Sequence, residues 1–287
     1  MPKLLGVSRD EIYSPNMTAN DREIFMAVAK RLEERGCEVD VMEERVMTRA
    51  FLQKSYDLVF TMARHANVLS LLSEFSQLHP GCVVNSPEGI KSCDKAVITD
   101  VMKHLCIPMP NSYVLDLTSK PSLPAQLSFP LWVKRGDQCA QCKEDVNFVE
   151  DHPALLEALL DFKFRGVTHA VLSAHQEGDI VKFYSVAGTT FFDWDYADPA
   201  HSKYGHEAIN GVPNKYPFNP NKLKEEADRL ADALGVPVYG GDCVVDADGH
   251  FYIIDFNDWP SFSRCRYRAS IAIAERIMNV LKDQDNG

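Results

Sequence analysis

The chain has 287 residues, 45% of them hydrophobic and 25% charged, a composition typical of a soluble globular protein large enough for two or three domains. Its 41 acidic residues outnumber its 30 basic ones, and no long basic block occurs, so we do not expect a nucleic-acid-binding surface. Apolar runs stay shorter than a membrane span, and the N-terminus turns polar before a signal-peptide core could form. We therefore expect a cytoplasmic protein with no membrane partner.

The eight cysteines are scattered along the chain, which favours reduced thiols over a disulfide framework. Cys139 and Cys142 form a single CxxC motif. Because no second CxxC and no nearby CxxH accompanies it, a zinc site is not favoured.

Residues 1–90 alternate short apolar runs with helical patterns, which predicts a parallel sheet with flanking helices. In the first predicted helix, Ile24, Val28 and Leu32 form one apolar stripe, Thr18 or Asn20 can cap its start, and Gly36 suits its end. The turn after the first strand lacks a glycine-rich dinucleotide fingerprint, and no P-loop motif occurs. Neither a dinucleotide-binding Rossmann site nor a P-loop is therefore expected.

Two further units follow, at 91–175 and 176–287. The second begins with a helix that holds Ile98 and Met102 and continues through strands and the helix 152–164. The third is rich in strands, includes a helical pattern at 220–235 and closes with a helix from residue 266. Between its strands lies the polar segment 197–220, and a loop of that length is more often functional than inert. We predict an α/β (α+β) protein of three domains.

The segment 240–260 combines apolar strands with oxygen-bearing side chains. With a turn at 246–249, Val245 faces His250 and Asp242 faces Ile253, and because side chains alternate, Asp242, Asp255 and Asn257 emerge on one face. Diagonal neighbours on such a ladder lie about 7–8 Å apart, a separation that suits oxygen ligands around a hard cation. We interpret the trio as a magnesium platform for a nucleotide. In the alternative, Asp242 is a capping residue and Asp255 ends an exposed strand.

Three lysines supply the complementary charge. Lys134 ends an apolar strand, Lys95 opens a helix, and Lys182 lies within a strand, so regular structure positions each of them. Phosphate oxygens are their natural partners. Each lysine alone is more often a solvated surface charge, and the hypothesis rests on their occurrence together with the acidic trio.

These segments resemble the ATP-grasp superfamily of ATP-dependent carboxylate-amine ligases, which includes glutathione synthetase and the ribosomal-protein glutamate ligases. The resemblance covers nearly the whole chain. It comprises "VVNSPEGIKSCDKAVITDVMKHLCIPMP", "FPLWVKRGD", "AVLSAHQEGDIVKFYSVAGTTFF" and, most specifically, "GGDCVVDADGHFYIIDFNDWPSF". It implies an ATP-grasp fold, in which an N-terminal Rossmann-like domain at 1–90 precedes a central subdomain at 91–175 and a C-terminal subdomain at 176–287.

The resemblance also implies site residues. Asp242, Asp255 and Asn257 would bind two magnesium ions, and Lys95 and Lys134 would contact the phosphates of ATP. The hinge would offer its backbone to adenine, and an acid just beyond it would bind the ribose. The hinge residues are Leu172, Ser173, Ala174 and His175, and the ribose-binding candidates are Glu177 and Asp179, of which Asp179 is counted with Lys182 among the nucleotide-binding residues.

Three features depart from the family pattern. The loop after Lys134, "RGDQCAQCKED", contains a single glycine, Gly136, where relatives have a glycine-rich phosphate loop, so Arg135 or Gln138 could contribute side chains instead. Pro260 and Ser261 replace a Pro-Gly pair that many relatives have after the magnesium motif. In the hinge, serine and histidine stand where Gln or Glu often accompanies adenine.

The implied mechanism runs through an acyl phosphate and yields ADP and phosphate. Its substrates are a carboxylate and an amine, as small molecules or peptides. Lys182 and Arg264 are the catalytic candidates, and Arg264, the first of three arginines after the magnesium motif, would hold an acceptor carboxylate. Two alternatives are a kinase of the same architecture acting on a hydroxyl group, and a nucleotide-binding protein with little turnover.

Overall fold

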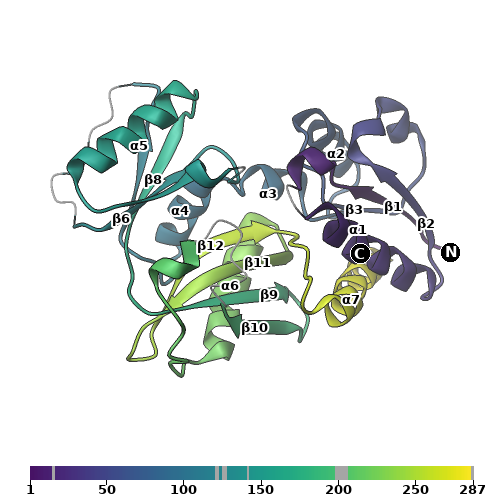
Figure 1. The fold of residues 1–287 in the computed structure, drawn as a ribbon. Helices are drawn as coiled ribbons and strands as arrows, with labels where there is room; N and C mark the ends of the chain where they lie inside the picture. Colours follow the sequence, from purple (N-terminus) through teal and green to yellow (C-terminus); the bar gives the residue numbers. More distant parts are fainter. Residues whose placement is uncertain (15–16, 120–122, 125–127, 141, 198–205, 286–287) are drawn as a thin grey trace.

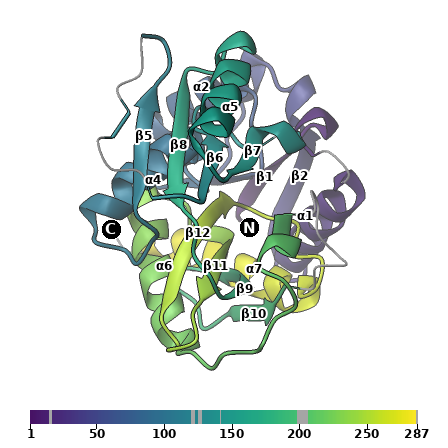
Figure 2. The same ribbon diagram turned by 60° about the vertical axis from the view of Figure 1, so that its left-hand side comes forward.

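The structure, a computed structural model, describes the chain except residues 15–16, 120–122, 125–127, 141, 198–205 and 286–287. Three four-stranded sheets follow one another along the described part of the chain. The second and third sheets lie one above the other, and the first lies to one side of both (Figures 1 and 2).

The first sheet is wholly parallel, with strand order β2-β1-β3-β4, as predicted for the N-terminal region. Its strands are β1 (Lys3–Ser8), β2 (Glu38–Glu43), β3 (Leu58–Thr61) and β4 (Val83–Val84), and its helices are α1 (Thr18–Glu33) and α2 (Ala66–Leu78). Short 3-10 turns lie at η1 (Glu11–Tyr13), η2 (Glu44–Val46) and η3 (Arg49–Gln53). The predicted stripe of Ile24, Val28 and Leu32 is buried, but the N-cap is Met17 without a side-chain cap bond. The predicted capping by Thr18 or Asn20 is wrong, because the helix already starts at Thr18.

The second sheet is antiparallel, with strand order β5-β8-β6-β7. Its strands are β5 (Ser112–Asp116), β6 (Leu131–Arg135), β7 (Val146–Val149) and β8 (His169–Ala174), and the turn η4 (Lys143–Asp145) precedes β7. The helices of this region are α3 (Pro87–Lys91), α4 (Lys95–His104) and α5 (His152–Phe164). Helix α5 covers one face of the sheet through Leu155, Leu159 and Phe162, which share a core with Val133 and Leu172.

The third sheet is also antiparallel, with strand order β10-β9-β11-β12. Its strands are β9 (Asp179–Val186), β10 (Phe192–Tyr196), β11 (Val238–Val245) and β12 (Phe251–Asp258), with the turn η6 (His206–Ile209) and helix α6 (Pro220–Leu234) between them. Helix α6 packs Leu223 and Leu230 onto one face of the sheet. The opposite face of the third sheet is directed toward the second sheet.

The last helix, α7 (Arg266–Asp285), returns to the first sheet. Its residues Ile273 and Ile277 share a buried core with Ile24 and Leu32 of α1. The two ends of the chain therefore stabilise the same core. This core joins residues of the first predicted unit, 1–90, to residues of the third, 176–287.

The β11–β12 hairpin has the predicted turn but a different register. Asp246 N donates to His250 O at 3.0 Å, and Gly249 has a φ of +81°, as a turn of this composition requires. Val245 pairs with Phe251, not with His250, and Asp242 pairs with Asp255, not with Ile253. The predicted register was wrong because the turn holds one more residue and because a β-bulge opposite Asp242 and Cys243 adds Ile254 to β12.

All eight cysteines are free thiols, as predicted from the sequence. In the described part of the chain, no helix is long and apolar enough to cross a membrane.

Asn85 joins the first and third sheets, and we predict that Asn85→Ala destabilises the protein by about 2–4 kcal/mol. The side chain is fully buried. Its Nδ2 donates to Val238 O at 2.8 Å and its Oδ1 accepts from Val238 N at 2.9 Å. The variant removes the acceptor of the Val238 N–H and leaves Val238 O with one donor, Trp259 N, at 2.8 Å. Urea unfolding measures the change. The exposed Asn67→Ala in α2 is the matched control, and an equal loss in both variants would contradict the prediction.

Candidate active site

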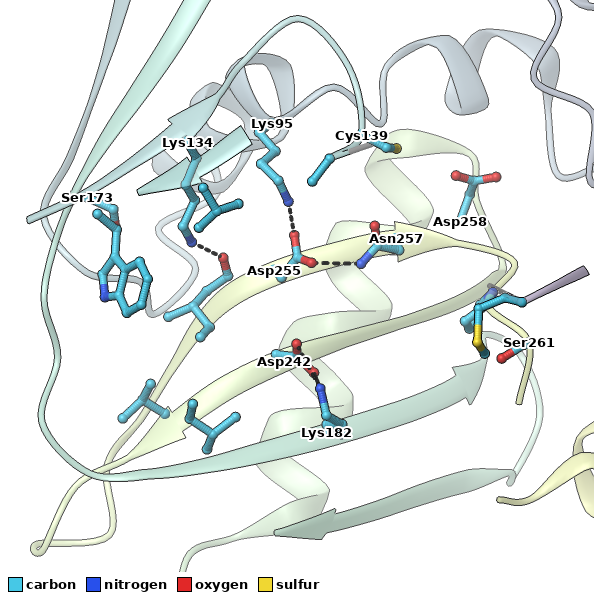
Figure 3. A pocket seen from close by; sticks show the side chains of 18 of the residues that line it. Lys95, Lys134, Cys139, Ser173, Lys182, Asp242, Asp255, Asn257, Asp258 and Ser261 are labelled. Atoms are coloured by element: carbon cyan, nitrogen blue, oxygen red, sulfur yellow. Dashed lines mark hydrogen bonds and ion pairs between the residues drawn. The ribbon is translucent and has the colours of Figure 1, made fainter. Parts of the chain in front are cut away.

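A cavity of about 400 Å³ lies between the second and third sheets and reaches the first. Of the predicted site residues, it is lined by Lys95, Lys134, Ser173, Ala174, Lys182, Asp242, Asp255 and Asn257. Most of the residues chosen from the sequence therefore meet in one place (Figure 3).

The acidic trio lies on the cavity face of the β11–β12 hairpin. Asp242 stands directly opposite Asp255, and Asn257 follows two residues along β12 opposite Gly240. Directly opposed side chains on an antiparallel ladder have Cβ atoms about 4.5–5.5 Å apart, closer than the diagonal spacing expected from the predicted register. The two carboxylates therefore emerge from neighbouring strands on the same face of the hairpin.

Two lysines balance this negative charge. Lys95 Nζ pairs with an oxygen of Asp255, and Lys182 Nζ lies 3.5 Å from both oxygens of Asp242. Burial opposes ionisation of Asp255 and of Lys95, but their mutual attraction outweighs it, so the pKa of Asp255 is lowered and that of Lys95 is raised. Both groups are held in their charged forms.

Lys134 contacts the bulge of β12. The bulge places Ile254 and Asp255 next to one another on the cavity side, and Lys134 Nζ donates to the carbonyl oxygen of Ile254 at 2.8 Å. Burial, together with the positive charge of Lys95, lowers the pKa of Lys134 to about 8. This ammonium is therefore mostly protonated at pH 7 and loses its proton just above that pH, and a nearby anion would stabilise the protonated form.

The hinge segment offers fewer backbone groups than predicted. Leu172 is buried in the core of the second sheet, Ala174 N donates to Asn111 O at 2.8 Å, and His175 N donates to Pro130 O at 3.1 Å. These two donors are thus engaged within the protein. Gln176, the next residue along the chain, lines the cavity.

An apolar slot lies beside the hinge. Ile180, Val244 and Ile254 form a small cluster on the third sheet, and Trp132 faces the cavity from the second. The ring of His175 is a packing element here, because its Nδ1 accepts from Trp132 Nε1 at 3.2 Å. The slot presents aliphatic and aromatic surface to a flat apolar ligand.

Four predicted residues do not line the cavity: Leu172 and His175 of the hinge, and Asp179 and Arg264. Asp179 is buried and accepts from Asn214 N and Tyr216 N at 2.7 Å each, so it holds the segment before α6 and is not free to bind a ribose. Arg264 pairs with Asp193 at 3.0 Å and Asp195 at 2.8 Å on β10. Its guanidinium is neutralised by that strand, which corrects its placement at the acceptor end.

The long loop and the glycine-poor loop are only partly described. Of the segment 197–220, residues 198–205 lie outside the described residues. In the loop after Lys134, Arg135 pairs with Asp137 at 2.7 Å, and Asp137 accepts from Thr168 N at 2.8 Å. Cys139 and its neighbour Ala140 line the cavity beyond this anchored base.

Sequence reasoning missed two arginines at the end of the cavity that the first sheet lines, called here its N-terminal end. Arg9 follows β1 and Arg64 follows β3, and both line the cavity together with Asp258. A signal was present, because ligands of open α/β sheets bind outside the carboxyl ends of the strands, and these arginines stand at that edge on neighbouring strands.

The donor set fits a hard divalent cation. Asp242 and Asp255 supply carboxylate oxygens, and Asn257 directs its Nδ2 at Asp255 Oδ2 at 2.9 Å, which turns its amide oxygen away from Asp255. Oxygen-only sets of this kind suit magnesium. These three residues could hold such an ion against a phosphorylated ligand.

Comparisons with known proteins give structural neighbours only. No protein-family model matches the sequence, and no curated protein matches it. Among solved structures, the chain is similar to D-alanine–D-alanine ligase from Bacillus anthracis, with a TM-score of 0.66, 15% identity, and coverage of 99% of this chain and 100% of that one. The same enzyme complexed with ATP gives a TM-score of 0.67 at 16% identity, covering 99% of both chains.

The protein therefore has the ATP-grasp fold of these ligases over nearly its whole length, which confirms the predicted fold class. The glutathione synthetase or ribosomal-protein glutamate ligase type stays a prediction, because the two neighbours are ligases of another type.

We predict that Lys95 and Asp255 stabilise each other in the ligand-free protein with a coupling free energy of about 1–3 kcal/mol. Single replacement, Lys95→Met or Asp255→Asn, leaves one charged side chain without this counter-ion, whereas the double variant removes both charges. Urea unfolding of the four proteins without divalent cations closes the double-mutant cycle.

The exposed pair Arg49 and Glu74 is the matched control, with Arg49→Met and Glu74→Gln. Its coupling should stay below about 1 kcal/mol, because solvent screens it. Equal coupling free energies in the two cycles would contradict the predicted stabilisation of the Lys95–Asp255 pair by burial.

Proposed function

We propose that the protein is an ATP-dependent ligase that joins a carboxylate to an amine through an acyl phosphate and releases ADP and phosphate. The observation that carries this proposal is the convergence of three lysines and an Asp/Asp/Asn trio on one cavity, beside an apolar slot. The ATP-grasp fold, found in a ligase solved with ATP, supports it.

The nucleotide would lie along the cavity with its base in the apolar slot. Trp132 and Ile254, which both line the cavity, would cover the two faces of the base, and Ala174 and Gln176 would supply polar contacts at its edge. The triphosphate would then extend toward Lys95 and Lys134. Their ammonium groups would exchange Asp255 and the Ile254 carbonyl for phosphate oxygens.

Magnesium would be held by Asp242, Asp255 and Asn257, and it would neutralise charge on the transferred phosphoryl group. Release of Lys95 and Lys182 to the phosphates would free both carboxylates for the ion. Nucleotide and ion are thus expected to bind together more tightly than either alone.

The chemistry asks the protein mainly for position and charge. A carboxylate oxygen of the first substrate attacks the γ-phosphorus, and ADP leaves. The amine nitrogen of the second substrate then attacks the acyl carbon, loses a proton and displaces phosphate. Lys182, opposite Asp242 on the cavity face, would stabilise the transferred group while it carries extra negative charge.

The identities of the two substrates are the open part of the proposal. D-Alanine, the substrate named for the structural neighbours, belongs in the first screen with other amino acids and small carboxylates. ADP release that requires both a carboxylate and an amine would favour the ligase over a hydroxyl kinase. ATP binding without acceptor-stimulated hydrolysis would favour a nucleotide-binding protein.

We predict that Asp255→Asn lowers magnesium-dependent ATP turnover by at least about a hundredfold, since an amide replaces a charged oxygen ligand. Phosphate release in the presence of the substrates found by the screen measures the change, and circular dichroism checks the fold.

Asp248→Asn, in the exposed turn of the same hairpin, is the matched control and should leave turnover within about twofold of the wild type. Unchanged turnover in Asp255→Asn would sink the site assignment.

We further predict that ATP binding takes up a proton at alkaline pH. The pKa of Lys134 is about 8 in the free protein, and adjacent phosphates would return it toward its usual value near 10.5. Binding should therefore take up about one proton at pH 9 and close to none at pH 7. Isothermal titration calorimetry in buffers of different ionisation enthalpy measures this number.

Lys134→Arg separates this proton from others, because arginine keeps its charge throughout the range. The variant should bind ATP without the uptake at pH 9. If the uptake persists, another group takes the proton and the role given to Lys134 fails.

A further inference from the structure

We propose that Arg9 and Arg64 form a carboxylate-binding subsite at the N-terminal end of the cavity. This proposal rests on the proposed function, because the ligase reaction defines which ligand the subsite would bind. It would hold a carboxylate that does not react, carried either by the acid substrate as a second acidic group or by the amine substrate.

The first step concerns the backbone beneath the two arginines. Glu44 is 1% exposed, and its carboxylate accepts three backbone hydrogen bonds of 2.7 Å, from Asp10, Arg64 and His65. One buried carboxylate from the end of β2 thus fixes the loops that follow β1 and β3. Because both loops are bound to the same carboxylate, the backbone segments that carry the two arginines are held next to each other.

The second step concerns Asp258, which binds the guanidinium group of Arg64 and lies close to that of Arg9. Its side chain is fully buried, its Oδ1 pairs with Arg64 Nη2, and its Oδ2 lies 3.9 Å from Arg9 Nη2. The attraction of Asp258 outweighs burial and raises the pKa of Arg64, so the arginine stays charged. A single carboxylate at the end of β12 therefore lies next to two guanidinium groups at one end of the cavity.

The third step counts donors. Arg9 also donates to Asp21 at 3.1 Å and to the carbonyl oxygens of Met62 and Trp259 at 3.2 Å each, and Arg64 donates to Cys139 Sγ at 2.7 Å. A guanidinium carries five N–H groups, so these contacts leave each arginine able to donate further.

A purely structural role explains less of this arrangement. Burying charged groups is costly, and one ion pair would suffice to fasten the first sheet to β12. Here two guanidinium groups line the same cavity together with the polar side chains Tyr13, Ser14 and Ser261. Because Asp21 and Asp258 already balance their charges, the subsite would recognise a planar anion through directed hydrogen bonds, for which a guanidinium fork is suited.

The test titrates malonate, alanine and alaninamide into the protein by isothermal titration calorimetry. Malonate represents an acid substrate with a second carboxylate, alanine an amine substrate with its own carboxylate, and alaninamide the same amine without it. Titrations are run with and without Mg²⁺ and a non-hydrolysable ATP analogue. Malonate or alanine should bind, and alaninamide should bind at least about tenfold more weakly than either.

The decisive variant is Arg64→Met combined with Asp258→Asn, which removes one guanidinium without leaving a buried carboxylate unpaired. It should lower the affinity for the carboxylate probe at least about tenfold and leave the affinity for the ATP analogue within about twofold. Lys134→Met is the matched control, with the opposite pattern expected. Whichever probe binds identifies the substrate that carries the carboxylate.

The proposal is overturned if neither carboxylate binds, if alaninamide binds as well as alanine and malonate does not bind, or if the double variant binds the probe like the wild type. Equal loss of probe and ATP analogue in the double variant would assign the arginines to the triphosphate instead. Failure of the wild type to bind the ATP analogue would reject the proposed function, while the titration without nucleotide would still decide the subsite.

Discussion

Two carboxylates facing each other across an antiparallel ladder repel, and Asp242 and Asp255 stand in this position on the β11–β12 hairpin. The fold tolerates them because Lys182 and Lys95 approach from β9 and from α4. In the proposed reaction the same lysines serve the phosphates, so a ligand that withdraws them must be accompanied by another cation for the carboxylates. The hairpin therefore links the binding of an anion to the binding of a metal ion through charge balance alone.

The bulge in β12 makes this arrangement possible. Without the extra residue, strand alternation would turn Asp255 toward the opposite face from Tyr252, into the core beneath α6. With it, Ile254 and Asp255 both reach the cavity, and the carbonyl of Ile254 is available to Lys134. Gly241 on the facing strand has no room for a side chain, because a Cβ there would collide with the Asp255 carbonyl oxygen. The close approach of the two strands thus depends on a residue in each of them, Gly241 in β11 and the bulge residue Ile254 in β12.

The sequence was sufficient for what depends on local periodicity and insufficient for what depends on register and distant packing. Apolar patterns located nearly all helices and strands. Asp242 and Asp255 were predicted on one face, and they lie there because the bulge compensates for the one-residue error in the predicted register. A bulge such as the one at Ile254 leaves no clear local pattern, so the pairing was predicted incorrectly. Arg264 was chosen for its nearness in sequence to the acidic motif, whereas Arg64 reaches the cavity only because β3 lies beside β1 in the folded sheet.

The two sides of the cavity are joined to the third sheet by different kinds of contact. Trp259, directly after β12, is buried against Phe25 of α1 and Phe60 of β3, with ring centroids 6.1 and 6.3 Å away. That side is fixed by apolar packing. The second sheet meets β12 partly through polar contacts, including the Lys95 and Lys134 bonds to the bulge region. Because a bound polyphosphate can replace these bonds but cannot replace the aromatic packing, adjustment to ligand should occur on the side of the second sheet, while the end of β12 and the two arginines remain in place.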